Sequence, residues 1–311
     1  MPFRHDGPRT MELRHLRYYV AVAEALNFTK AATVLRVAQP ALSRQVQDLE
    51  EELGVDLLRR SPRGVTLTAE GKLFLEEARD LLRRTGEAME KVRALARGEF
   101  GELHIGYAPS PSVEILPPAL AAFQKAAPGV KVTLHDLAGD ELIAGLLDGS
   151  LELAVTVEHT EEGGAGILYE ELRRYPFCLA MAPGHAWAKK KTVSLEDIAT
   201  QPLVALRRQD YTEFYRILDR MFAPAGVQPR IAVECDGSTS LLTEVETGRG
   251  VAIVSELFKR IAGKRLLYRP ISNSRDFHSV GIARSAKGDV TPAGEKFCEA
   301  LRAAAGVKVA E

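Results

Sequence analysis

The segment that begins at Gln39 places several polar side chains close together in the chain. Gln39 and Arg44 carry the groups that pair bidentately with adenine and guanine in the major groove, and the Ser43 hydroxyl can donate to a phosphate. Pro40 suits a first helical turn because its missing N–H would have no partner there. These residue types and their spacing predict a helix whose amino end contacts double-stranded DNA. A solvated helix face is the alternative interpretation of any one of them.

The charge distribution around this segment supports the prediction. The chain carries 41 basic and 42 acidic residues, a formal charge of −1, so no overall field attracts it to nucleic acid or membrane. Residues 27–47 and 57–69 nevertheless contain no Asp or Glu, and they include Lys30 and Arg63. Such segregation lets one face neutralise phosphates and release counterions. We therefore expect Lys30 and Arg63 to contact the DNA backbone.

Helices and a hairpin must position these side chains. Apolar residues recur at steps of three and four from Leu13 to Leu26, a second helix can be capped by Thr29, and the helix that starts with Pro40 stops at Gly54. Residues 55–68 then place a Pro-Arg-Gly turn between two apolar runs, which predicts a two-stranded wing. Residues 11–68 are thus predicted to form a winged helix-turn-helix, and residues 1–10 are excluded from the fold as an extension.

Residues 69–98 are predicted to form one long helix, which Thr68 can cap. At 1.5 Å per residue its thirty or so residues reach roughly 45 Å. A coiled-coil seam runs along it through Leu75, Ala78, Leu82, Thr85, Met89, Val92 and Ala96. We expect this seam to pair two copies of the chain in a homodimer. Packing of the helix on its own domain is the alternative.

From residue 101 short β-branched runs, among them Leu151–Val157 and Phe177–Ala182, alternate with helical stretches. This alternation predicts βαβ units and a mostly parallel sheet. Residues 141–157 and 241–255 share a pattern in which a helix ends in glycine and leads into an apolar strand, as two similar lobes with a cleft between them would. The predicted fold class is multidomain α/β, with an effector-binding domain over 101–311. Its lobe I covers about 101–172 and 275–311, and its lobe II about 173–270.

Three loops after predicted strands supply candidate ligand-binding residues. Ser110, Gly139 and the pair Ser238 and Thr239 stand where a strand gives way to a helix. Amides and the helix dipole favour an anion at such positions. Each loop alone also fits a plain helix cap, and Phe214, which could pack on an apolar part of a ligand, also fits the core. Convergence of the loops on one cleft would create a site for a carboxylate-bearing small molecule.

The sequence offers no catalytic constellation. Its seven histidines lack metal-ligand spacing, and neither a GxxxxGK loop nor a nucleophile elbow occurs, so we expect no enzyme, no metal and no cofactor. Cys178, Cys235 and Cys298 are far apart, which favours buried thiols over a thiol that senses oxidation. No signal peptide and no stretch of roughly 18 apolar residues is found, which predicts a cytoplasmic protein without a membrane partner.

Residues 11–71 closely resemble the DNA-binding domain of LysR-type transcriptional regulators. The resemblance is carried by Ala31–Ala32, Leu35, Gln39–Arg44, Leu49–Glu50, Leu53–Gly54, Leu57, Arg60, Leu67–Thr68 and Gly71. It extends more weakly over the chain from Met11. It implies a winged helix-turn-helix, a long dimerisation helix and a two-lobed domain similar to periplasmic solute-binding proteins. Gln39, Pro40, Ser43, Arg44 and Arg63 match positions that lie against DNA in this family.

The resemblance also implies partners. Residues 11–32 are especially similar to the subgroup that controls aromatic catabolism in response to muconate or benzoate, in which Ser110 matches a contact of the effector carboxylate. Gly139 departs from the hydroxyl residue common there, so the same ligand is not implied. The implied partners are promoter DNA, an aromatic or dicarboxylate effector, further copies in a dimer or tetramer, and RNA polymerase. The alternatives are a regulator of this type triggered by thiol oxidation and a solute-binding protein that does not bind DNA.

Overall fold

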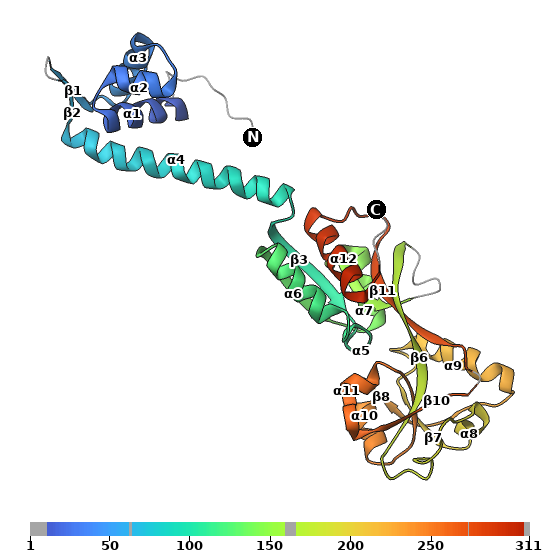
Figure 1. Cartoon of the computed structure of the whole chain (residues 1–311). Helices are drawn as coiled ribbons and strands as arrows, with labels where there is room; N and C mark the ends of the chain where they lie inside the picture. Colours follow the sequence, from blue (N-terminus) through green and yellow to red (C-terminus); the bar gives the residue numbers. More distant parts are fainter. Residues whose placement is uncertain (1–10, 62–63, 159–165, 273, 308–311) are drawn as a thin grey trace. The chain divides into compact units, whose positions relative to one another are not determined.

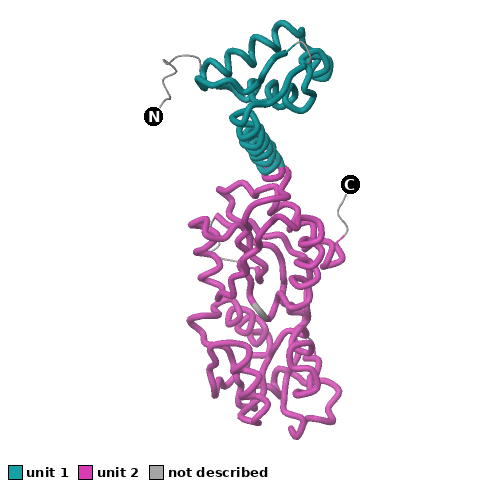
Figure 2. Tube along the Cα trace, turned by 90° about the vertical axis from the view of Figure 1, so that its left-hand side faces the viewer, with its two compact units in different colours: residues 1–93 teal, residues 94–311 magenta. Residues whose placement is uncertain are grey.

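The computed structural model describes residues 11–61, 64–158, 166–272 and 274–307. They belong to two compact units, of which the first reaches to Arg93 and the second starts at Ala94 (Figure 2). Within these described ranges no helix combines the length and the hydropathy that a membrane span requires.

The first unit is a winged helix-turn-helix, as the sequence predicts (Figure 1). Its elements are α1 (Leu13–Ala25), α2 (Phe28–Leu35), α3 (Gln39–Leu53), β1 (Leu58–Ser61) and β2 (Gly64–Leu67). β1 and β2 pair antiparallel and make the wing. The three helices meet in one apolar core that includes Tyr19, Leu42, Val46 and Leu49, all inaccessible to solvent.

The ends of these helices are fixed by particular side chains. Asn27 caps α2, because its Oδ1 accepts a hydrogen bond from the Lys30 backbone N–H at 2.9 Å. The prediction that Thr29 caps this helix is therefore wrong. Helix α2 already starts at Phe28, so Thr29 lies inside its first turn, where its backbone carbonyl accepts a hydrogen bond from the Thr33 hydroxyl. Helix α3 begins after Ala38, whose methyl group makes no cap hydrogen bond.

Helix α4 (Ala69–Ala96) is continuous, as predicted, and Thr68 caps it through a 2.8 Å hydrogen bond from the Gly71 backbone N–H. The seam does not serve one purpose along its whole length. Leu75 and Ala78 pack into the core of the first unit, so the expectation that they face a second chain is wrong. Farther along, the side chains of Met89 and Val92 are 48% and 69% exposed. Only this later part of the seam remains open to a partner helix.

The second unit is a mixed α/β structure with two lobes. Its strands are β3 (Phe100–Tyr107), β4 (Gly129–Asp136), β5 (Leu153–Val157), β6 (Ile167–Met181), β7 (Pro202–Leu206), β8 (Arg230–Cys235), β9 (Ala252–Ser255), β10 (Leu267–Pro270) and β11 (Phe277–Ser285). Its helices are α5 (Pro109–Ser112), α6 (Leu116–Ala126), α7 (Gly139–Asp148), α8 (Leu195–Ala199), α9 (Thr212–Phe222), α10 (Ser238–Glu246), α11 (Phe258–Ala262) and α12 (Pro292–Ala305).

The sheet is less parallel than the sequence predicts. β3 pairs parallel with β4 and β5, and β7 pairs parallel with β8. The ladders that β6 and β11 form with their neighbours are all antiparallel. The prediction of a mostly parallel sheet is wrong for these strands, because β11 lies between β5 and β6 and runs antiparallel to both, and β9 and β10 run antiparallel to β6.

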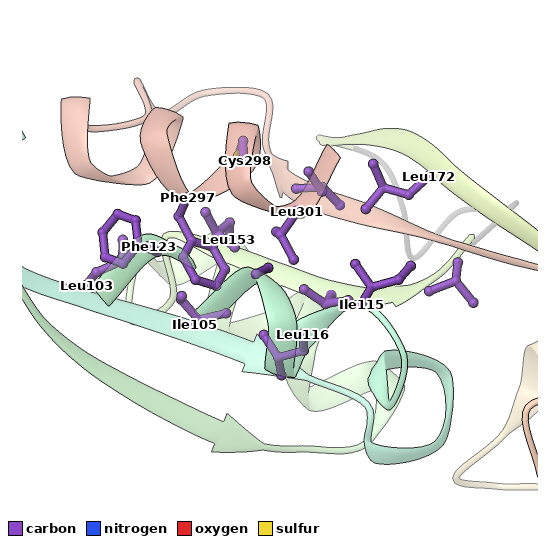
Figure 3. Packing of buried hydrophobic residues seen from close by; sticks show 14 of the residues in the cluster. Leu103, Ile105, Ile115, Leu116, Phe123, Leu153, Leu172, Phe297, Cys298 and Leu301 are labelled. Carbon is purple, nitrogen blue, oxygen red and sulfur yellow. The ribbon is translucent and has the colours of Figure 1, made fainter. Parts of the chain in front are cut away.

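Strand β6 links the two lobes. Its first part, from Ile167 to Pro176, pairs with β11, and its last part, from Phe177, pairs with β9 and β10. In lobe I, α6 and α12 pack on β3 through a core in which Phe123 and Phe297 meet edge to face at 5.2 Å between ring centroids (Figure 3). Lobe II is built around two further clusters, one containing Phe222 and Leu203, the other Val254 and Leu242.

Candidate functional site

The amino end of α3 carries the side chains that the sequence selects for DNA contact. Gln39, Pro40 and Arg44 are exposed, whereas the apolar residues Leu42, Val46 and Leu49 are buried. Opposite faces of one helix thus hold the core and present the polar groups, as the apolar period requires. Lys30 lies on α2 and is also exposed. Arg63 lies outside the described residues.

Ser43 is tied to the wing by a residue whose part in the site the sequence does not reveal. Arg60 on β1 donates from Nη1 to Ser43 Oγ at 2.9 Å, and its guanidinium lies over the Phe28 ring at 4.8 Å. A third contact, at 3.6 Å, joins Arg60 to the Glu50 carboxylate. Glu50 in turn accepts the backbone N–H groups of Leu57 and Leu58. Arg60 therefore fixes the wing against α2 and α3.

A cavity of about 120 Å³ lies between the two lobes of the second unit. It brings together four of the five residues predicted to bind the ligand: Ser110, Gly139, Phe214 and Ser238. The hydroxyls of Ser110 and Ser238 share a hydrogen bond across the cleft, although the two residues belong to different lobes. Thr239, the fifth, lines a neighbouring open groove with Ser240 and lies outside the cavity lining.

Helix ends surround this cavity. The first residues of α7, α9 and α10 contribute Gly139, Thr212 and Ser238 to its wall. In α10 the first backbone helical bond is donated by Leu241 to Gly237 at 3.0 Å, so the amides before Leu241 have no acceptor inside the helix. Three helix N-termini therefore direct partial positive charge toward one space.

The charged side chains of the wall are acidic. Asp140, Asp210 and Glu213 line the cavity, and among the described residues of that lining there is no Lys or Arg. Arg207 pairs with Asp210 at 3.1 Å, and Arg208 pairs with Asp219 at 3.3 Å, but neither arginine belongs to the cavity lining. An anion in the cavity would thus be bound by amides and hydroxyls rather than by a guanidinium.

Phe214 fits both of the roles that its sequence position leaves open, that of a ligand contact and that of a core side chain. It is half-buried, packs against the apolar core of lobe II and borders the cavity. Phe177 and Phe258 also line the wall, which makes much of it aromatic. An apolar wall with a few polar groups is typical of small-molecule sites.

Two lining residues that the sequence analysis does not single out are Thr156 on β5 and His278 on β11. The Thr156 side chain is 1% exposed, and neither its Oγ1 nor His278 Nδ1 has a hydrogen-bond partner among the described residues. Burial lowers the pKa of His278 to about 4. A lone threonine in the apolar run Leu153–Val157 is the sequence signal that could have revealed Thr156, because buried hydroxyls require partners.

All three cysteines are reduced and buried. Burial raises the pKa of Cys178 and Cys298 to about 12 and also raises that of Cys235. Oxidation requires the thiolate and access to it. The geometry thus favours the interpretation of these residues as core side chains over that of an oxidation trigger.

Comparisons with known proteins agree with both parts of this description. The model of the bacterial regulatory helix-turn-helix protein, lysR family, matches residues 13–72, and that of the LysR substrate binding domain matches residues 96–306. The HTH-type transcriptional regulator AlsR of Bacillus subtilis (strain 168) is 34% identical over 262 residues, which are 83% of this chain and 85% of AlsR. TcbR of Pseudomonas sp. (strain P51) is 35% identical over 82% of this chain and 90% of its own.

Solved structures extend the likeness to the whole fold. The crystal structure of CbnR, a LysR family transcriptional regulator, superposes with a TM-score of 0.82 at 33% identity and covers 94% of this chain and 100% of CbnR. Full-length CbnR in complex with its target DNA matches with the same score over 95% of this chain. The chain therefore belongs to the LysR family: it is a DNA-binding transcriptional regulator that carries an effector-binding domain and forms oligomers.

Proposed function

We propose that the amino end of α3 enters the major groove of a promoter site and contacts base edges through Gln39 and Arg44. Ser43, Pro40, Lys30 and Arg63 would then lie along the DNA backbone and fix the register. The observation that supports this most directly is the division of α3 into a buried apolar face and an exposed polar end.

We further propose that the cavity between the lobes binds a small carboxylate-bearing effector, either aromatic or a dicarboxylate. Ser110, Ser238 and the amides at Gly139 would bind its carboxylate, and Phe214 would pack on its apolar part. Support comes from the shared hydrogen bond of the two serines and from the helix ends around them. Thr239 was also predicted to bind the ligand. Because it lines the adjacent groove, we propose that it affects ligand binding only indirectly, through the position of α10.

The proposed organisation is a DNA-binding domain over 11–68, a linker helix over 69–98 and an effector-binding domain over 101–311. Two copies would pair through the exposed later part of α4, and dimers would pair into tetramers. We place the protein in the cytoplasm, where a chromosomal regulator and RNA polymerase meet, and we propose that it has no catalytic activity, since its relatives are transcriptional regulators.

Arg44→Ala tests the DNA contact. We expect a loss of about 1–3 kcal/mol at a cognate site and a relaxed base preference at one position, measured by fluorescence anisotropy with single-base variants of the promoter. Arg275→Ala, which removes an exposed positive charge from the second unit, is the control. An Arg44→Ala protein with wild-type affinity and intact helical signal would contradict the proposal.

Ser110→Ala tests the effector site. Effector and DNA binding must be coupled by the same factor in both directions. We therefore expect the variant to need a higher effector concentration for the same change in DNA affinity, whereas DNA binding without effector stays at the wild-type level. An unchanged effector response would place the site elsewhere.

A further inference from the structure

The lining of the cavity also contains polar atoms that have no part in the proposed carboxylate site formed by Ser110, Ser238 and the helix ends. Thr156 Oγ1 is buried in β5 and lacks a hydrogen-bond partner among the described residues, and so does His278 Nδ1 in β11. Both residues line the cavity. A buried polar group without a partner is unfavourable, and such groups are rare in folded proteins. Two of them at one cavity indicate that a ligand completes their bonding.

The two atoms offer separate contacts. In the antiparallel ladder Thr156 is the register partner of Gly281, three residues along the strand from His278. His278 is opposite Tyr175 of β6, and its ring stacks at a tilt on Phe177, 5.5 Å between centroids. The cavity lining therefore offers one hydroxyl, from Thr156 on β5, and one imidazole nitrogen, from His278 on β11, next to the aromatic ring of Phe177.

The charges around the cavity restrict the ligand. The helix ends of α7, α9 and α10 can stabilise one negative group. The carboxylate of Asp140, in the first turn of α7, opposes a second negative group, and that of Glu213, in the first turn of α9, is already paired with Arg216 at 3.1 Å. No cationic side chain among the described lining residues would compensate a second negative charge on the ligand. His278 does not supply a charge either, since its burial keeps the imidazole neutral at neutral pH.

We propose that Thr156 and His278 bind uncharged hydrogen-bonding groups of the effector, which is therefore a small hydroxylated aromatic monocarboxylic acid rather than a dicarboxylate. The inference rests on the proposed effector cavity. A hydroxyl both donates and accepts, so it can pair with the threonine hydroxyl and with either tautomer of a neutral imidazole. A second carboxylate only accepts, and it would lose its hydration without a counter-charge.

The test is isothermal titration calorimetry of the full-length chain with benzoate, the monohydroxybenzoates, 3,4-dihydroxybenzoate and the three phthalates. The wild type is expected to bind the best hydroxybenzoate at least about 10-fold more tightly than benzoate, the factor that about 1.4 kcal/mol confers. Phthalates are expected to bind no better than benzoate. In Thr156→Val the preference for the hydroxylated acid is lost, and the benzoate Kd stays within about twofold. His278→Phe, which keeps a ring beside Phe177, removes the added gain from a second hydroxyl.

Stability without ligand provides a second readout. Thr156→Val replaces an unpaired buried hydroxyl by a methyl group of similar size, so the melting temperature of the free chain should be unchanged or higher by about 2–4 °C. Thr133→Val, a matched control on β4 outside the cavity lining, should leave the ligand preferences as they are.

Three results would overturn the inference. The first is phthalate binding as tight as that of the hydroxybenzoates, and the second is an equal loss of benzoate and hydroxybenzoate affinity in Thr156→Val. The third is a lower melting temperature of free Thr156→Val, which would show that the hydroxyl already has a partner. If no acid binds while promoter DNA does, the ligand class is wrong and the DNA-binding function stands; loss of DNA binding as well would reject the proposed function itself.

Discussion

Replacement of Arg60 by alanine should loosen the wing and the recognition helix together. The side chain makes three contacts that alanine cannot make: the hydrogen bond to Ser43, the stack on Phe28 and the ion pair with Glu50. At exposed positions a cation–π contact contributes about 0.5–1 kcal/mol, a hydrogen bond about 0.5–1.5 kcal/mol and an ion pair about 0–1 kcal/mol. The Arg60 side chain is 42% exposed, so values near the lower ends apply and the expected loss is about 1 kcal/mol.

Hydrogen exchange of the full-length chain, followed by mass spectrometry, measures this loss where it occurs. A change of about 1 kcal/mol in local opening free energy accelerates exchange roughly 5-fold, and we expect it in α2, α3 and the wing. Arg59→Ala is the matched control, since Arg59 is the exposed neighbour on the same strand and carries the same charge. Both variants should lower the salt dependence of DNA binding to a similar degree.

The two variants separate a structural role from a simple phosphate contact. Only Arg60→Ala should combine faster exchange in α3 with a loss of base preference, because Ser43 loses the group that holds it. If both variants weaken DNA binding equally and exchange in α3 stays at the wild-type rate, Arg60 acts through its charge alone and the reasoning from its three contacts is refuted.

Three further outcomes follow from the structure. Asn27→Ala should cost about 1 kcal/mol of α2 stability because it removes the helix cap, whereas Thr29→Ala should cost little; equal faster exchange in the two would contradict the assignment. Gly71→Ala should prevent stable folding of the first unit, since a Cβ there would lie 2.0 Å from the backbone carbonyl oxygen of Leu57. A Cβ at Gly86 would meet no atom within 4 Å, so Gly86→Ala should raise the stability of α4 in thermal unfolding by up to about 1 kcal/mol. Burial lowers the pKa of His278 from 6.5 to about 4, so as the pH falls the unfolded chain takes up a proton at this histidine before the folded chain does. The free energy of unfolding should therefore fall between about pH 6.5 and pH 4. The melting temperature of His278→Phe should fall less over this range, and a fall identical to that of the wild type would show that the pKa of His278 is not lowered by folding.

Local signals in the sequence were sufficient for the DNA-binding half. The apolar period of α1 and α3, the proline at the start of α3 and the glycine after it determine where these helices lie and which face is buried. The cap of α2 was misassigned by two residues, because Asn27 and Thr29 have equivalent chemistry and only the backbone of Asn27 takes the extended cap conformation. A cap depends on backbone angles as well as on residue type.

The second unit shows where local signals end. The first part of β6 escaped prediction because charged side chains at Glu170, Glu171, Arg173 and Arg174 interrupt its apolar pattern, and it becomes a strand through pairing with β11, more than a hundred residues away in the sequence. Its direction relative to β11 depends on the same distant pairing. Strand direction is a property of partners, so it cannot be determined from either strand alone.

The sequence by itself determined the family of fold, the polar end of α3 and the three loops that supply Ser110, Gly139 and Ser238, because these depend on periodicity and residue type within short segments. Only the tertiary structure decided that Thr156 and His278 share their cavity, that Thr239 lies beside it, and that Arg60 holds Ser43. Each of those facts depends on distances between residues far apart in the chain, and such distances are fixed by the packing of whole elements rather than by the neighbours of any one residue.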